Sequence, residues 1–113
     1  MGAQRVPGWV GGGRVRQGTT PPHTYVLPMS TDMLQEIEIV YVQEGRTVLR
    51  RLKQDMACEG NKVTLQLTQN DTFSFSTGSN VEIQVRVKTN EGAVFGSGSM
   101  YVTVEKCLST EVL

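Results

Sequence analysis

The stretch Val81-Glu82-Ile83-Gln84-Val85-Arg86-Val87-Lys88-Thr89 alternates apolar and polar side chains without interruption. Successive side chains of a β-strand point to opposite faces, so this period of two predicts a strand with one buried and one wet face. No segment of the sequence keeps an apolar stripe at helical spacing over three turns. The only helical feature expected is one turn at 68–73, with Thr68 as its N-cap. The sequence therefore predicts an all-β chain.

Similar period-two segments occur on both sides of this stretch, separated by turn signals such as Glu44-Gly45. In the segment 34–42, for example, Ile37 and Ile39 share one face while Glu36 and Glu38 share the other. Short strands at this spacing predict an antiparallel two-sheet sandwich of immunoglobulin-like (Ig-like) type with about seven strands. A small closed barrel is the alternative. The expected strands are 24–27, 34–42, 46–53, 55–58, 62–67, 81–89, 93–95 and 100–105.

The composition of the chain changes near residue 23. Residues 1–22 contain six of the twelve glycines, three of the four prolines and no acidic residue. We expect them to form a flexible basic arm, either a simple disordered tail or an assembly arm that becomes ordered on a partner. Residues 23–113 are expected to form the sandwich domain. Deletion of residues 1–16 should then leave the melting temperature nearly unchanged.

The composition also excludes several classes of function. Eleven Lys and Arg residues balance eleven Asp and Glu residues, so no overall positive charge favours nucleic-acid binding. No apolar run approaches the ~18–20 residues of a membrane helix, and no apolar segment near residue 1 predicts a secretory signal. Cys58 and Cys107 are expected as free thiols in a reducing compartment, with a disulfide between them as the alternative.

Catalytic chemistry has little support in the sequence. One histidine and two cysteines are too few for a zinc site built from these residues alone. His23, the only histidine, follows Pro21-Pro22 and is expected on the surface or on an edge strand. Glu36 and Glu38 are expected to point into water. We therefore predict a protein that is not an enzyme and that has no cofactor, no metal and no small-molecule substrate.

Three stretches carry a resemblance to a known group of proteins. Residues 20–28 have the pattern Thr-Pro-x-His-x-x-x-Leu-Pro, residues 39–43 read Ile-Val-Tyr-Val-Gln, and residues 108–113 read Leu-Ser-Thr-Glu-Val-Leu. In these stretches the chain resembles small Ig-like proteins encoded among the tail and baseplate genes of Firmicutes phages and prophages. The resemblance covers residues 17–113 and suggests kinship with the N-terminal domains of phage upper-baseplate proteins. That group defines no functional residues.

The resemblance implies a structural protein of the phage tail or baseplate, or an adaptor for its assembly. Such a protein would be found in the virion, and in the host bacterial cytoplasm during assembly. Its partners would be other virion or tail proteins, or further copies of itself, bound through edge strands and surface patches. The residues expected to contact partners lie in the arm and in the last six residues, and they are Trp9, Arg14, Arg16, Leu108, Val112 and Leu113.

Two alternatives remain open at the level of sequence. The segment Leu108–Leu113 is either a free tail that adds to a neighbouring sheet or a last strand packed on its own domain. The whole protein is alternatively a surface- or carbohydrate-binding β-sandwich module. That second function requires two or three exposed aromatic side chains on one face of the sandwich.

Overall fold

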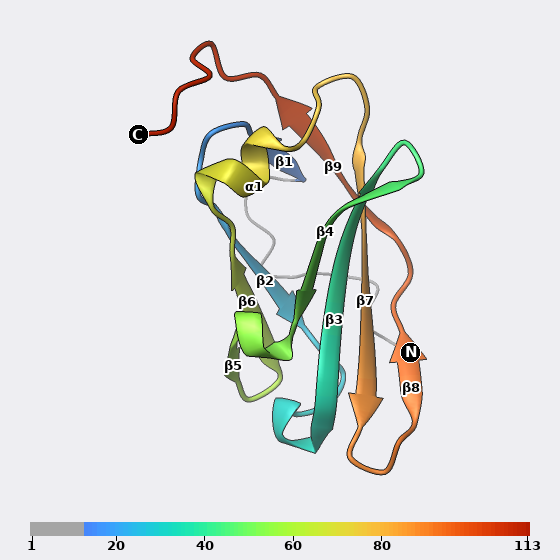
Figure 1. Cartoon of the computed structure of the whole chain (residues 1–113). Helices are drawn as coiled ribbons and strands as arrows, with labels where there is room; N and C mark the ends of the chain where they lie inside the picture. The colour runs from blue at the N-terminus through green and yellow to red at the C-terminus, as the bar shows by residue number, and fades with distance from the viewer. Residues whose placement is uncertain (1–12) are drawn as a thin grey trace.

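The computed structural model describes residues 13–113, whose strands form two facing sheets (Figure 1). The larger sheet has the order β1-β9-β7-β3-β4, with β8 also paired to β7, and the smaller sheet has the order β2-β6-β5. The strands are β1 (Arg14–Arg16), β2 (Pro22–Val26), β3 (Leu34–Gln43), β4 (Arg46–Leu52), β5 (Ala57–Glu59), β6 (Lys62–Gln66), β7 (Val81–Thr89), β8 (Val94–Gly96) and β9 (Met100–Glu105). Short helices lie at η1 (Thr31–Met33), η2 (Lys53–Asp55) and α1 (Gln69–Phe73).

Strands β3 and β7 form the centre of the larger sheet. They pair antiparallel over most of their length, with Ile39 opposite Val85 and Tyr41 opposite Ile83. These four side chains are buried because they face the smaller sheet. Their alternation with polar residues is the pattern that predicted the two strands, and burying them supplies much of the hydrophobic stabilisation.

The strand order identifies the architecture. The smaller sheet β2-β6-β5 faces the sheet β4-β3-β7-β9, which is the way Ig domains divide their strands between two sheets. The predicted fold class is therefore confirmed: the chain is an all-β, Ig-like sandwich. Nine strands are described within residues 13–113: one in each of the eight expected segments, and β1 in addition.

One edge of β7 is filled by β8 and β9 in succession. β9 pairs with Val81–Ile83, and β8 pairs with Arg86–Lys88. Between them, the hydroxyl oxygen of Ser97 accepts the backbone N–H of Val85, and the N–H of Ser97 donates to the carbonyl of Val85. β9 continues past the start of β7, so the chain leaves the sheet at the end opposite β8 (Figure 1).

The boundary expected at residue 22 is wrong for the part of the arm that the structure describes. Arg14–Arg16 forms β1, a strand parallel to β9, and Val15 is buried in the core. The sequence pattern missed this strand because a single apolar residue between two arginines is too short to show alternation. Deletion of residues 1–16 would remove β1, so it is no longer expected to leave the melting temperature unchanged. Residues 1–12 lie outside the described range.

The prediction for His23 is half confirmed, because β2 is an edge strand of the smaller sheet but the His23 side chain is not on the surface. His23 lies on β2 with its side chain in the core, where its Nδ1 is 2.7 Å from the hydroxyl of Tyr41. The hydroxyls of Tyr41 and Tyr25 are 2.8 Å apart, so the three side chains form one buried polar cluster. The surface placement was wrong because the preceding prolines suggested a loop, whereas Pro22 is the first residue of the strand and His23 faces inward.

The helical turn at 68–73 is confirmed as α1, whose N-cap is Thr68. The Thr68 hydroxyl accepts the backbone N–H of Asp71, and the Asp71 carboxylate accepts the N–H of Thr68, so the two form a capping box. Asp71 also pairs with Arg51 at 2.8 Å, which ties α1 to the edge strand β4. None of the helices within residues 13–113 has the length and apolar character needed to cross a bilayer.

Candidate binding site on the outer face of the larger sheet

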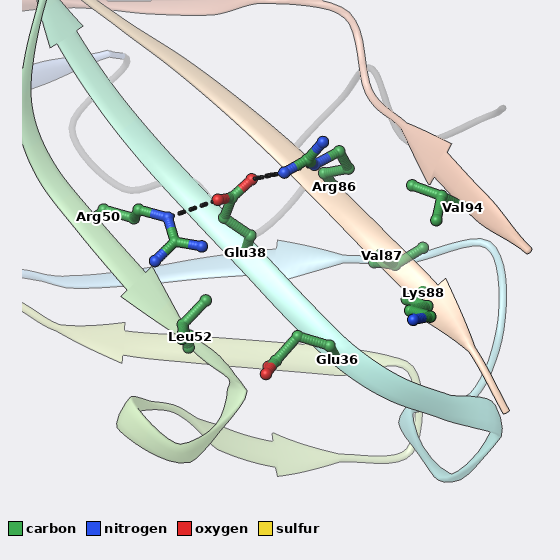
Figure 2. Close-up of a pocket in the computed structure, with 8 residues that line it drawn as sticks. All are labelled: Glu36, Glu38, Arg50, Leu52, Arg86, Val87, Lys88 and Val94. Carbon is green, nitrogen blue, oxygen red and sulfur yellow. Dashed lines mark hydrogen bonds and ion pairs between the residues drawn. The ribbon is translucent and has the colours of Figure 1, made fainter. Parts of the chain in front are cut away.

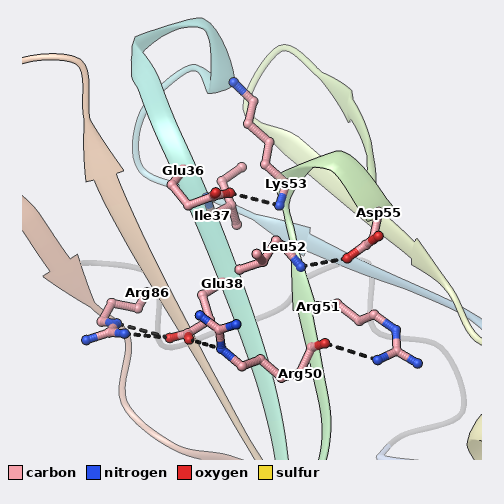
Figure 3. Close-up of polar contacts among 9 residues, drawn as sticks. All are labelled: Glu36, Ile37, Glu38, Arg50, Arg51, Leu52, Lys53, Asp55 and Arg86. Carbon is pink, nitrogen blue, oxygen red and sulfur yellow. Dashed lines mark hydrogen bonds and ion pairs between the residues drawn. The ribbon is translucent and has the colours of Figure 1, made fainter.

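A carboxylate held between two arginines marks the outer face of the larger sheet. Glu38 projects from β3, with Arg50 on β4 to one side and Arg86 on β7 to the other (Figure 3). Arg50 Nε lies 2.6 Å from Glu38 Oε2, and Arg86 Nη2 lies 2.9 Å from Glu38 Oε1. Because β3 is central, one carboxylate ties together three adjacent strands. We call these three residues the outer cluster.

The electrostatics of the outer cluster favour a permanent charge on Glu38. The hydrogen bond from Arg50 lowers the pKa of the Glu38 carboxyl, an effect that partial burial opposes and the charge of Arg86 reinforces. The Glu38 side chain is only 14% exposed, whereas those of Arg50 and Arg86 are 56% and 61% exposed. Glu38 lies on the outer face of the sheet, as expected, but it does not point freely into water, because neighbouring strands supply two guanidinium groups that cover it.

Glu36 lies next to the outer cluster but has a structural role. Its Oε1 accepts the backbone N–H of Lys53 at 3.1 Å and that of Ile37 at 3.0 Å (Figure 3). The Lys53 ammonium in turn donates to the carbonyls of Thr31 and Leu34. These bonds hold the end of β4 against the start of β3. They also mean that one oxygen of Glu36 is already occupied by backbone N–H groups of the same chain.

A shallow pocket of about 210 Å³ opens beside the outer cluster (Figure 2). Its apolar surface includes Leu52 from β4 and Val94 from β8, and Val94 is 54% exposed. Lys88 from β7 adds a third cation, and within residues 13–113 it makes no ion pair. The residues that line the pocket are Glu36, Glu38, Arg50, Leu52, Arg86, Val87, Lys88 and Val94.

The chemistry of this pocket suits an anionic group attached to an apolar one. Arginine has five N–H donors, and Arg50 uses only its Nε within the described part of the chain, so both its Nη groups remain available. Three cations against two carboxylates leave the lining with a net charge of +1. The Glu38 carboxylate is held by its two arginines, so it is not free to act as a general base. No group of three potential metal-ligating side chains occurs within residues 13–113.

The contact residues expected in the arm are only partly described. Arg14 and Arg16 lie on β1 with exposed side chains and pair with Glu105 of β9 at 3.9 and 3.3 Å. Arg16 also donates to the carbonyl of Lys106, two residues before the C-terminal segment 108–113. Trp9 lies outside the described residues.

The contact residues expected in the C-terminal segment are all exposed. Leu108 is 95% exposed, Val112 55% and Leu113 102%, and no strand includes them. The segment is therefore not a last strand packed on its own domain. Its described contact is with α1, where Gln69 binds the backbone N–H and carbonyl of Leu113 through its side-chain amide. The structure does not bring this segment to the outer cluster of the same chain.

Exposed aromatic side chains do not gather on one face. Tyr25, Tyr41 and Phe75 are buried, whereas Phe95 and Tyr101 are exposed. Phe95 lies opposite Val87 and Tyr101 opposite Glu82, and residues 87 and 82 project from opposite faces of β7. The described residues thus lack the shared aromatic platform that the carbohydrate-binding alternative requires.

The sequence analysis missed every member of the outer cluster as a site. The alternation in β3 and β7 placed Glu38 and Arg86 on wet faces, but only the pairing of β3 with both β4 and β7 brings them together. Arg50 lies on β4, the edge strand of the larger sheet, where an exposed charge is common and does not by itself indicate a site. A prediction of strand order would have been needed to find the site.

Comparisons with known proteins add little to this description. A scan against protein-family models finds no match, and a search of the curated proteins finds no matching relative. Among solved structures, the chain is similar to extracellular domains 3–5 of Drosophila OTK, with 12% sequence identity and a TM-score of 0.36. The alignment covers 82% of this chain and 30% of that one, so the chain spans under a third of that structure. The class of protein is defined by the strand order alone, as an Ig-like sandwich.

Proposed function

We propose that this protein is a non-enzymatic structural component of a phage or prophage tail or baseplate, or an adaptor for its assembly. The observation that carries the proposal is the C-terminal segment 108–113, which leaves the sandwich with its apolar side chains in water. Exposed apolar side chains grouped in one segment are typical of protein–protein contact sites. The resemblance of residues 17–113 to phage tail-gene products supplies the biological setting.

The outer cluster supports the same proposal. Arginine is enriched at protein interfaces because its planar guanidinium binds carboxylates while its stem packs on apolar surface. Arg50 and Arg86 are pre-positioned by Glu38, so less side-chain entropy is lost when a partner binds. Partners are then other tail proteins or copies of this chain, with the virion and the host cytoplasm as the places of action.

Mass spectrometry of purified phage particles, induced from the strain that carries this gene, tests the proposal. We expect peptides from the region Val81–Lys106 at a level comparable to those of other tail proteins. Nuclease-treated, gradient-purified particles exclude carry-over from the lysate. Absence of these peptides from the particles, with the protein present in the lysate, would contradict a structural role.

A further inference from the structure

We propose that the pocket beside the outer cluster binds the C-terminal segment 108–113 of a second copy of this chain. This inference rests on the proposed function. It names a second copy of the chain as the partner that joins the outer cluster and the C-terminal segment. Copies would join head to tail, the segment of one entering the pocket of the next. Three features of the molecule favour this occupant: the charge of the pocket, its apolar surface, and the positions of the pocket and the segment in the fold.

The pocket offers cationic and apolar surface side by side. Arg50, Arg86 and Lys88 surround it, and at least two guanidinium nitrogens of Arg50 have no partner within the described chain (Figure 2). Val94 and Leu52 contribute apolar surface within the same opening. A ligand that fits both features carries a carboxylate next to aliphatic side chains.

The C-terminal segment has this composition. Glu111 is the only charged side chain in residues 107–113, and Val112 and Leu113 follow it directly. Glu111, Val112 and Leu113 are all exposed, so none of them has to leave a buried position in order to bind elsewhere. A net charge of +1 on the pocket lining meets one negative side chain on the segment, which is the charge complementarity expected of a specific contact.

The positions of the two sites favour a contact between copies over a contact within one chain. β9 pairs with Val81–Ile83 and continues past the start of β7, whereas Arg86 and Lys88 lie on the other half of β7. The C-terminus accordingly lies at the α1 end of the sandwich, and β8, with the pocket, lies towards the opposite end (Figure 1). A contact between two different surfaces repeats from copy to copy and generates rings or filaments.

The contact of the segment with its own domain does not prevent this exchange. Gln69 holds only the backbone of Leu113, while the Leu113 side chain stays fully exposed. When the segment moves to the pocket of another copy, it loses the two surface hydrogen bonds between Gln69 and Leu113. In exchange, its aliphatic side chains are buried and Glu111 gains an ion pair with the cations of the pocket. Surface hydrogen bonds contribute little net free energy because water competes for the same groups.

Sedimentation velocity on the full-length chain tests the inference. We expect the wild-type chain to associate as its concentration rises to about 300 µM, a range that detects weak contacts. A chain ending at Cys107 should stay monomeric with an unchanged melting temperature. Lys88→Glu should raise the dissociation constant at least about fivefold, because repulsion of Glu111 replaces attraction.

Charge exchange distinguishes a direct contact from an indirect effect. The double variant Lys88→Glu/Glu111→Lys should recover the wild-type dissociation constant to within about twofold, since the pair is restored with reversed signs. Lys62→Glu is the matched control, because Lys62 is an exposed lysine on β6 of the smaller sheet. It should associate as the wild type does.

Three results would overturn the inference: a monomeric wild type at all concentrations, association that survives removal of residues 108–113, or failure of the charge exchange to restore it. None of these would contradict the presence of the protein in phage particles, which the mass spectrometry measures separately. Absence from particles, conversely, would overturn the proposed function while leaving the contact between copies measurable.

Discussion

Two polar clusters lie on opposite faces of the same strand, β3, and they differ in whether their polar groups can reach solvent or a partner. On the inner face, Tyr41 is bonded to His23 and Tyr25 within the core. On the outer face, Glu38 is bonded to Arg50 and Arg86 at the surface. We call the first set the inner cluster.

The difference lies in charge and in access to solvent. Burial lowers the pKa of His23 to about 4 and raises that of Tyr41, so the inner cluster is neutral at pH 7. The outer cluster stays ionised, and its arginines have side chains more than half exposed. Buried neutral groups support the fold, whereas exposed charged groups can bind a partner. Variants of each cluster should therefore change different properties of the protein.

The largest loss of stability is expected from the inner cluster. Tyr41→Phe keeps the ring, which stacks with Phe75, but removes the hydroxyl that joins His23 and Tyr25. Loss of two buried hydrogen bonds should lower the free energy of unfolding by about 2–3 kcal/mol, measured by urea denaturation. Tyr101→Phe is the control, because the exposed Tyr101 hydroxyl makes only a 3.4 Å bond to Glu82. Equal effects of the two variants would contradict the role given to the inner cluster.

The inner cluster should also make stability depend on pH. The His23 pKa is about 4 in the folded chain and about 6.5 when unfolded, so the unfolded chain binds more protons between these values. Stability should therefore fall as the pH falls, by about 1.5 kcal/mol between pH 6.5 and pH 5. His23→Gln removes the titrating group, so its stability, though lower, should change less over this interval. An identical pH profile for the wild type and this variant would be inconsistent with a buried neutral His23.

The outer cluster should contribute less to stability and more to salt dependence. Glu38→Gln removes the charge that holds Arg50 and Arg86, and should lower the free energy of unfolding by about 1 kcal/mol. This loss should shrink in 1 M NaCl, where charges are screened. Glu105→Gln is the matched control, because the Glu105 side chain is more exposed and its pairs with Arg14 and Arg16 are longer. This variant should lose less free energy of unfolding than Glu38→Gln. A loss that does not vary with salt would argue against an electrostatic role.

Much of the fold follows from local sequence. Alternation alone predicted β3 and β7 and placed Ile37 and Ile39 on one face, which is buried in the core. The capped turn at Thr68 was also predicted correctly, because a capping box is a local interaction. β1 was missed, since a three-residue strand has too little pattern and its pairing with β9 joins residues far apart in the chain. The burial of His23 was missed because the two preceding prolines suggested a loop.

The binding site depends on information that local patterns do not contain. Glu38, Arg50 and Arg86 come from three strands, and their proximity requires β3 to lie between β4 and β7. Each residue alone looks like an ordinary solvent-facing charge. The apolar C-terminal residues, by contrast, were singled out from sequence and are exposed in the structure.

The most direct test of the account is a titration of the ¹⁵N-labelled full-length chain with an unlabelled peptide of residues 107–113, followed by NMR. We predict saturable shifts at the amides of Glu38, Arg86, Lys88 and Val94, with the smaller sheet unaffected. A peptide carrying Glu111→Lys should shift them far less. No shifts at about 1 mM peptide, or shifts confined to β5 and β6, would contradict the claim that the outer face binds the C-terminal segment.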